Sequence, residues 1–192
     1  MKSIGIFCGS SAGVNPCYIQ TAQQVGKALA QADITLVYGG GKVGLMGAVA
    51  DACLANGGHV IGVMPRALVE REIAHTGVTE LFVVENMHER KTKMAQLSDG
   101  FIALPGGAGT LEEIFEQWTW AQLGIHEKPC AFLNVNGYYE PLHQMVQNMV
   151  GEGFMHARYA DMLPFAENIE HILLGFTRYT PPERKWMQTP RG

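Results

Sequence analysis

The sequence has 192 residues, of which 47% are hydrophobic and 17% are charged, and this suits one globular domain with a sizeable core. A formal net charge of −4 gives no electrostatic footprint for a nucleic-acid backbone, so we expect no nucleic acid among the partners. No apolar run reaches the ~18 residues of a membrane span, and residues 4–8 are too few for the apolar region of a signal peptide. We therefore expect a cytoplasmic protein with no membrane partner.

The four cysteines have neither CxxC spacing nor the Cys/His spacing of a metal site, and three of them lie in apolar runs. Reduced thiols are the expectation for such cysteines, in keeping with a cytoplasmic location. The seven histidines form no HxxxH pair or comparable cluster. We therefore expect no metal ion.

Taken in chain order, six apolar runs are typical of strands: Ile4–Cys8, Ile34–Tyr38, His59–Met64, Leu81–Val84, Gly100–Leu104 and Cys130–Val135. Most of the segments between them have helical periodicity. This alternation predicts an α/β fold, a Rossmann-like doubly wound parallel sheet with helices on both faces. We expect a single domain over residues 1–178. An irregular tail, residues 179–192, would lie over the surface or on a partner subunit.

Several of the predicted strands end in glycine- or serine-rich turns, among them Gly9–Ser11, Gly39–Gly41 and Pro105–Gly107. Ligands of open parallel sheets bind beyond the carboxyl ends of the strands, so these three turns predict one nucleotide crevice. No GxGxxG follows the first strand, and the lysine after the second turn, Lys42, lacks the spacing of a phosphate-binding Walker A loop. The crevice is therefore not predicted to be a dinucleotide site.

Helical spacing in the segment from Asn86 to Ser98 places two cations on an apolar face. This face carries Met87, Arg90, Lys91, Met94, Leu97 and Ser98. A buried guanidinium needs a carboxylate or a ligand anion, because an unpaired one costs several kcal/mol. The alternative for both cations is a long side chain that follows apolar surface out to water.

The segment from Leu104 to Glu113, LPGGAGTLEE, is the most informative part of the chain. Its glycines allow backbone N–H groups to approach an anion closely, and a helix predicted to start at Thr110 would favour a phosphate at its N-terminus. The alternative is a capping box, with Thr110 at the N-cap and Glu113 at N3, that serves only the helix.

The same predicted helix has a main apolar stripe formed by Leu111, Ile114, Phe115, Trp118 and Ala121. Glu113, Gln117 and Trp120 fall on a different face. Trp120 therefore indicates a second contact surface, which is either a pocket wall or a dimer interface. Because the helix with Arg90 leads directly into the strand before this turn, we expect Arg90 and Glu113 to meet beside one crevice.

Two motifs, MHERK at residues 87–91 and PGGAGTLEE at residues 105–113, resemble the signatures of the LOG (Lonely Guy) family of cytokinin riboside 5′-monophosphate phosphoribohydrolases. The resemblance spans nearly all of the chain up to about Tyr139 and includes CGSS, YGGG, GLMG and WAQLGIH, while PPER in the tail resembles bacterial members. Many relatives carry the older label lysine decarboxylase. This sequence has no lysine context for pyridoxal phosphate that would support that chemistry.

The resemblance implies hydrolysis of the N-glycosidic bond of a nucleoside 5′-monophosphate, without cofactor or metal, to a free adenine-type base and ribose 5-phosphate. It also implies a homodimer and two catalytic residues, Arg90 and Glu113. The substrate contacts that it implies are Glu72, Lys91, Gly107, Ala108, Gly109, Thr110, Leu111, Glu112 and Thr119. Ala108 stands where many plant relatives have Tyr, which affects the expected preference among base substituents.

Such a reaction passes through an oxocarbenium-like transition state, which needs negative charge near the sugar and an activated water or leaving base. We expect Glu113 to supply the charge and position the water, with Arg90 either fixing that carboxylate or contacting the nucleotide. Arg90 and Lys91 supply the positive charge that offsets the repulsion between Glu113 and the bound phosphate. The same cradle could belong instead to a non-catalytic nucleotide or cofactor carrier. The joint presence of Arg90 and Glu113 favours the enzyme, because binding alone does not require both.

Overall fold

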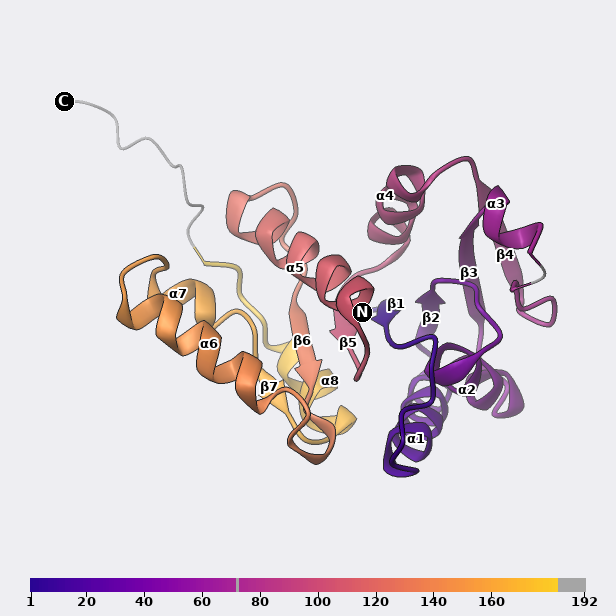
Figure 1. Ribbon diagram of the computed structural model, residues 1–192, viewed down its shortest axis with the longest axis horizontal. Helices are drawn as coiled ribbons and strands as arrows, with labels where there is room; N and C mark the ends of the chain where they lie inside the picture. Colours follow the sequence, from indigo (N-terminus) through magenta and orange to yellow (C-terminus); the bar gives the residue numbers. More distant parts are fainter. Residues whose placement is uncertain (72, 183–192) are drawn as a thin grey trace.

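The computed structural model describes residues 1–71 and 73–182. Its centre is a seven-stranded sheet in the order β4-β3-β2-β1-β5-β6-β7, with every neighbouring pair parallel (Figure 1). The strands are β1 (Ser3–Phe7), β2 (Thr35–Tyr38), β3 (Val60–Pro65), β4 (Glu80–Val84), β5 (Phe101–Ala103), β6 (Cys130–Leu133) and β7 (Phe165–Ala166). The six predicted strands are confirmed. The seventh, β7, was not predicted.

Helices cover both faces of the sheet (Figure 1). On one face lie α1 (Cys17–Gln31), α2 (Gly44–Ala55) and α8 (Ile169–Thr177); on the other lie α4 (Met87–Leu97), α5 (Ala108–Leu123), α6 (Glu140–Gly151) and α7 (Ala157–Ala160). The short α3 (Arg66–Val69) follows β3, and the 3-10 helix η1 (Val135–Gly137) follows β6. The predicted doubly wound, Rossmann-like architecture is therefore confirmed.

Burial on both faces explains why the central strands are almost continuously apolar. In β1, Ile4 and Ile6 belong to the core under α1 and α2, whereas Phe7 belongs to the core under α4 and α5. Ile6 lies in register with Ile102 of β5. The resulting rigid centre fixes where the loops at the carboxyl ends of β1 and β5 emerge.

The direction of winding reverses between β1 and β5. The chain runs outward from β1 through β2 and β3 to β4, then crosses back to place β5 on the other side of β1. The point of reversal, beyond the carboxyl ends of these two strands, is where open α/β sheets bind ligands. The two loops that leave it are joined directly, because the Gly9 N–H donates to the carbonyl of Pro105 at 3.0 Å.

Residues 179–182, which begin the predicted tail, have no regular secondary structure, and the rest of that tail lies outside the described residues. Within the described ranges, none of the helices combines the length and apolar character needed to cross a membrane.

Candidate active site

The cradle predicted from the glycine-rich turn is present, but its helix starts earlier than predicted. Helix α5 begins at Ala108, and Gly107 is its N-cap, in an extended conformation with no side-chain cap. The prediction that the helix starts at Thr110, and with it the capping box of Thr110 and Glu113, is wrong. The prediction rested on finding a residue whose side chain could cap the helix. Gly107 has no side chain and acts as N-cap through its backbone conformation alone, so this approach missed it. Glu113 is therefore not needed to cap the helix.

Gly106 is required for the close packing of this turn. A Cβ at this position would overlap the Thr110 hydroxyl and lie 2.8 Å from the Gly9 nitrogen. At Gly107 and Gly109, by contrast, a Cβ would meet no atom within 4 Å. These two glycines therefore border open space at the positive end of the α5 dipole, where an anion is favoured.

Helix α4 carries Arg90 to the edge of the cradle. The helix starts at a side-chain cap, in which Asn86 accepts a hydrogen bond from the Glu89 N–H at 2.9 Å. The Arg90 Nε donates to the carbonyl of Val63 in β3, at 3.1 Å. Its Nη2 lies against Gly39, where any Cβ would overlap the guanidinium. The absence of a side chain at Gly39 therefore makes room for Arg90.

Arg90 and Glu113 form an ion pair, as expected. Arg90 Nη1 lies 3.0 Å from Glu113 Oε1, and each side chain is only 12% exposed. Burial raises the pKa of the Glu113 carboxyl, while the positive charge of Arg90 acts in the opposite direction. The alternative of an Arg90 side chain that extends into water is therefore excluded.

Lys91 lies behind this pair and is held by two other carboxylates of α5. Its ammonium is 2.7 Å from Glu112 Oε1 and 3.1 Å from Glu116 Oε1, and its side chain is 15% exposed. Hydrogen bonding to Glu112 is the main cause of the raised pKa of Lys91. The lysine therefore joins α4 to α5 instead of extending into the cradle.

A cavity of about 270 Å³ joins the pair to the cradle. Its lining is Cys8, Gly9, Ser10, Met46, Met87, Arg90, Gly107, Gly109, Thr110, Glu112 and Glu113. Six of the predicted site residues are therefore together here: the two proposed catalytic residues and four from the start of α5. Cys8 and Met46 were not predicted as site residues. A signal for Met46 was available, because it follows the glycine turn after β2.

The other predicted contacts lie elsewhere in this structure. Ala108 is exposed at the first residue of α5, and Leu111 packs against the core. Thr119 is exposed further along α5, outside the described lining of the cavity. Glu72 lies outside the described residues. Trp120 is half-buried and meets His126 edge to face, with ring centroids 6.4 Å apart.

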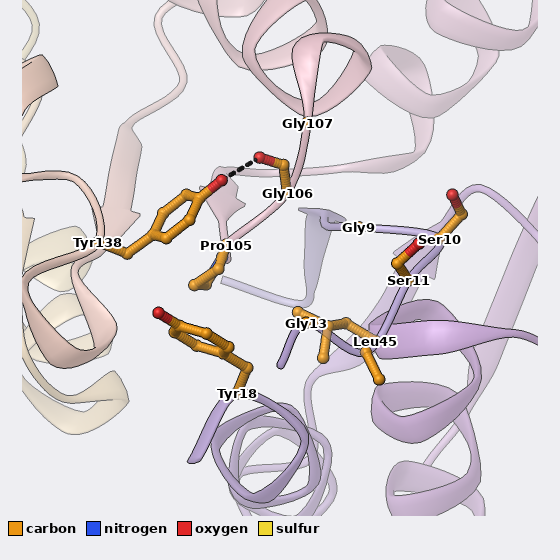
Figure 2. A pocket seen from close by; sticks show the side chains of 11 residues that line it. Gly9, Ser10, Ser11, Gly13, Tyr18, Leu45, Pro105, Gly106, Gly107 and Tyr138 are labelled. Carbon is orange, nitrogen blue, oxygen red and sulfur yellow. Dashed lines mark hydrogen bonds between the residues drawn. The ribbon is translucent and has the colours of Figure 1, made fainter. Parts of the chain in front are cut away.

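A second cavity, of about 330 Å³, lies beside the β1 loop (Figure 2). It shares Gly9, Ser10 and Gly107 with the first cavity, and its far wall is formed by Tyr18 and Tyr138. The two tyrosine rings meet edge to face at 5.8 Å. No sequence pattern predicted either tyrosine at the crevice.

Over residues 1–71 and 73–182, no group of three or more His, Cys, Asp or Glu side chains could hold a metal ion.

The sequence is similar to a family of known enzymes. Residues 46–174 match the family model described as "Possible lysine decarboxylase". The cytokinin riboside 5′-monophosphate phosphoribohydrolase of Rhodococcoides fascians is 51% identical over 155 residues, which cover 80% of this chain and 78% of the relative. The enzyme of the same name from Arabidopsis thaliana, LOG7, is 47% identical over 180 residues, covering 94% and 83%. The chain belongs to the LOG family.

Solved structures similar to this LOG-family chain include molybdenum cofactor carriers. The carrier protein of Chlamydomonas reinhardtii is 18% identical, with a TM-score of 0.69 over 92% of this chain and 96% of that one. The molybdenum cofactor binding protein of Rippkaea orientalis is 24% identical, with a TM-score of 0.62 over 77% and 85%. At this level of identity the likeness concerns the fold alone.

Proposed function

We propose that this protein is a nucleoside 5′-monophosphate phosphoribohydrolase. It hydrolyses the N-glycosidic bond of adenosine 5′-monophosphates, including N6-substituted ones, and releases the free base and ribose 5-phosphate. The observation that carries the proposal is the half-enclosed pair of Arg90 and Glu113 at 3.0 Å, directly beside an amide cradle. Relatives at 47% and 51% identity are named for this reaction, which supports the same assignment.

In the proposed mechanism, the bond between ribose C1′ and N9 of the base breaks, and the electron pair leaves with the base. Glu113 stabilises the positive charge that develops on the sugar and orients the water. The water oxygen forms the new bond to C1′ and loses one proton, and the departing base takes up one proton, so the step releases no net proton. Arg90 holds the carboxylate in place through its hydrogen bond.

The cradle at the start of α5 holds the 5′-phosphate. Binding energy from this remote group places the ribose against Glu113, so a nucleoside without phosphate is expected to react poorly. The guanidinium of Arg90 offsets the repulsion between the bound phosphate and the buried carboxylate. The proposal also includes substrate contacts from five further residues: Lys91, Ala108, Leu111, Thr119 and Glu72.

The decisive experiment is incubation with AMP and with N6-isopentenyl-AMP, followed by chromatography for free base. Release of adenine or of N6-isopentenyladenine is expected, together with equimolar ribose 5-phosphate. Intact nucleotide that stays bound to the protein after prolonged incubation would instead indicate a carrier and would contradict the proposal.

The variant Glu113→Gln separates the catalytic role from a structural one. The Gln amide oxygen can still accept from Arg90, so we expect the free energy of unfolding to change by about 1 kcal/mol or less. Turnover should fall roughly 100-fold or more, the scale of losing one preorganised electrostatic group. Urea unfolding and base release measure the two effects. Near-normal turnover would exclude Glu113 as a catalytic residue.

We also propose that the protein is a cytoplasmic homodimer. Leu123 and Ile125, at the end of α5, are 39% and 63% exposed beside the half-buried Trp120, which supports an interface on this side. The cysteines are free, which supports a reducing compartment. Light scattering that gave the mass of one chain would contradict the dimer, and cell fractionation tests the location.

A further inference from the structure

The turn that forms the phosphate cradle is held by an unusual set of hydrogen bonds. Three consecutive carbonyl groups, those of Leu104, Pro105 and Gly106, each accept a bond from a distant part of the chain. Tyr139 Oη donates to Leu104 O at 2.7 Å, Gly9 N–H to Pro105 O at 3.0 Å, and Tyr138 Oη to Gly106 O at 2.7 Å. Hydrogen bonds from other parts of the chain therefore fix the orientation of all three carbonyl groups.

The bond from Tyr138 determines the direction of an amide in the cradle. In a trans peptide the C=O and the next N–H point in opposite directions from one plane. The Gly106 carbonyl is drawn toward Tyr138 in the second cavity (Figure 2), so the N–H of Gly107 points away from the tyrosine. Gly107 lies between the two cavities and lines both. Since the Gly107 N–H points away from Tyr138, it is available to the other cavity that Gly107 lines, which also contains Arg90 and Glu113.

The neighbouring bond from Tyr139 cannot act in the same way. It is accepted by the carbonyl of the Leu104–Pro105 peptide, and proline has no N–H to aim. Tyr139 is also 2% exposed and packs against Phe132 in the core, whereas Tyr138 is 42% exposed. The two adjacent tyrosines thus offer one bond that orients a ligand-facing amide and one that serves the fold.

We propose that Tyr138 is a positioning residue for the substrate phosphate, acting through the Gly106–Gly107 peptide. It holds the Gly107 N–H aimed at the phosphate site and, by donating to the carbonyl of the same peptide, makes that N–H a stronger donor. Tyr18, in edge-to-face contact with Tyr138, keeps the ring in place from α1. The inference rests on the proposed function, because it assigns the cradle to the phosphate of the nucleotide.

The test compares Tyr138→Phe with Tyr139→Phe. Calorimetry with ribose 5-phosphate and with adenosine separates the phosphate from the rest of the nucleotide, and neither measurement needs turnover. We expect Tyr138→Phe to weaken ribose 5-phosphate binding about threefold to tenfold, the scale of one hydrogen bond. Adenosine binding and the melting temperature should not change. In steady state, KM for AMP should rise by the same factor with kcat unchanged.

Tyr139→Phe is the matched control, because it leaves a buried carbonyl unpaired without releasing an amide. It should lower the melting temperature and have no selective effect on the phosphate probe. If Tyr138→Phe weakened both probes equally, or left ribose 5-phosphate binding intact, the positioning role would be overturned while the proposed function stood. If the parent protein bound no ribose 5-phosphate at all, both proposals would be contradicted.

Discussion

At the scale of single residues, the site depends on a cation and a carboxylate that are both largely removed from water. Arg90 donates to the Val63 carbonyl and to the Glu113 carboxylate, and its Nη2 lies against Gly39, which has no side chain. An ion pair at this depth costs desolvation energy, and it is favourable only when the partners are well aligned and further hydrogen-bonded. The pair is therefore sensitive to small displacements of the guanidinium.

The variant Gly39→Ala would displace the guanidinium without removing either charged group. The new methyl group would overlap the far end of the Arg90 side chain and lie in ordinary contact with Met46 Sδ at 3.4 Å, so the fold should be retained while the guanidinium moves away. Loss of the nearby positive charge should raise the pKa of Glu113 further above its ordinary value. Because the ionised carboxylate is the active form, we expect lower turnover and an acid limb of the pH–rate profile shifted to higher pH.

The control for this prediction is Gly41→Ala, whose methyl group would meet the flexible end of Met46. It should leave the acid limb where it is. Equal shifts in the two variants, measured as kcat/KM against pH, would show that the effect does not pass through Arg90.

At the scale of elements, the start of α5 combines two demands on the sequence. A helix favours alanine over glycine, yet the first turn of this helix contains Gly109, where a side chain would project into the cavity. The glycine thus lowers the stability of the helix while keeping space free for a ligand.

We therefore expect Gly109→Ala to stabilise the protein by up to about 1 kcal/mol and to weaken AMP binding about tenfold or more. Gly175→Ala in α8 is the matched control, since its methyl group would also meet nothing within 4 Å but lies on another helix. Urea midpoints and calorimetry distinguish the effects. Unchanged AMP affinity in the Gly109 variant would place the phosphate away from this turn.

Some elements and contacts of the fold could be predicted from the sequence, and others could not. The six longer strands followed from apolar runs, which are local signals. The meeting of Arg90 with Glu113, 23 residues apart, followed from chain order, because the helix of Arg90 leads directly into the strand before the turn. The two-residue β7 is too short to have a period. Tyr138 reaches Gly106 from a loop 32 residues further along the chain, and the pairing of Lys91 with Glu116 spans 25 residues. Contacts of this kind depend on how elements pack, which no local pattern contains.

At the scale of the whole molecule, His126 connects the end of α5 to the sheet. Its Nε2–H donates to the buried Gln117 side chain at 3.2 Å, its Nδ1 accepts from the Lys128 N–H at 3.2 Å, and the ring packs on Phe101. Burial, and secondarily the charge of Lys128, lower the pKa of His126 to about 4. The imidazole is therefore held neutral in the folded protein.

This predicts a loss of stability in mild acid. In the unfolded chain His126 is protonated below its ordinary pKa of about 6.5, whereas in the folded protein it is protonated only below about pH 4. The free energy of unfolding should fall across this interval, on the order of 1 to 2 kcal/mol once partial solvent screening is allowed for. His126→Gln should flatten this dependence, and His88→Gln, at an exposed position on α4, should not. Urea midpoints from pH 4 to 7 measure it, and parallel curves for all three proteins would refute it.

The reversal of strand order has a consequence for the protein while it is being made. Until residues 101–103 pair with it, β1 has one side of its backbone without a neighbour, although it is destined for the middle of the sheet. A chain that ends before residue 101 lacks β5 and the turn after it, and therefore lacks both the neighbour of β1 on this side and the anion cradle. Insertion of β5 covers that side of β1 and brings the cradle to the β1 loop in the same event, so a chain able to bind its ligand is also one whose sheet is complete at this point.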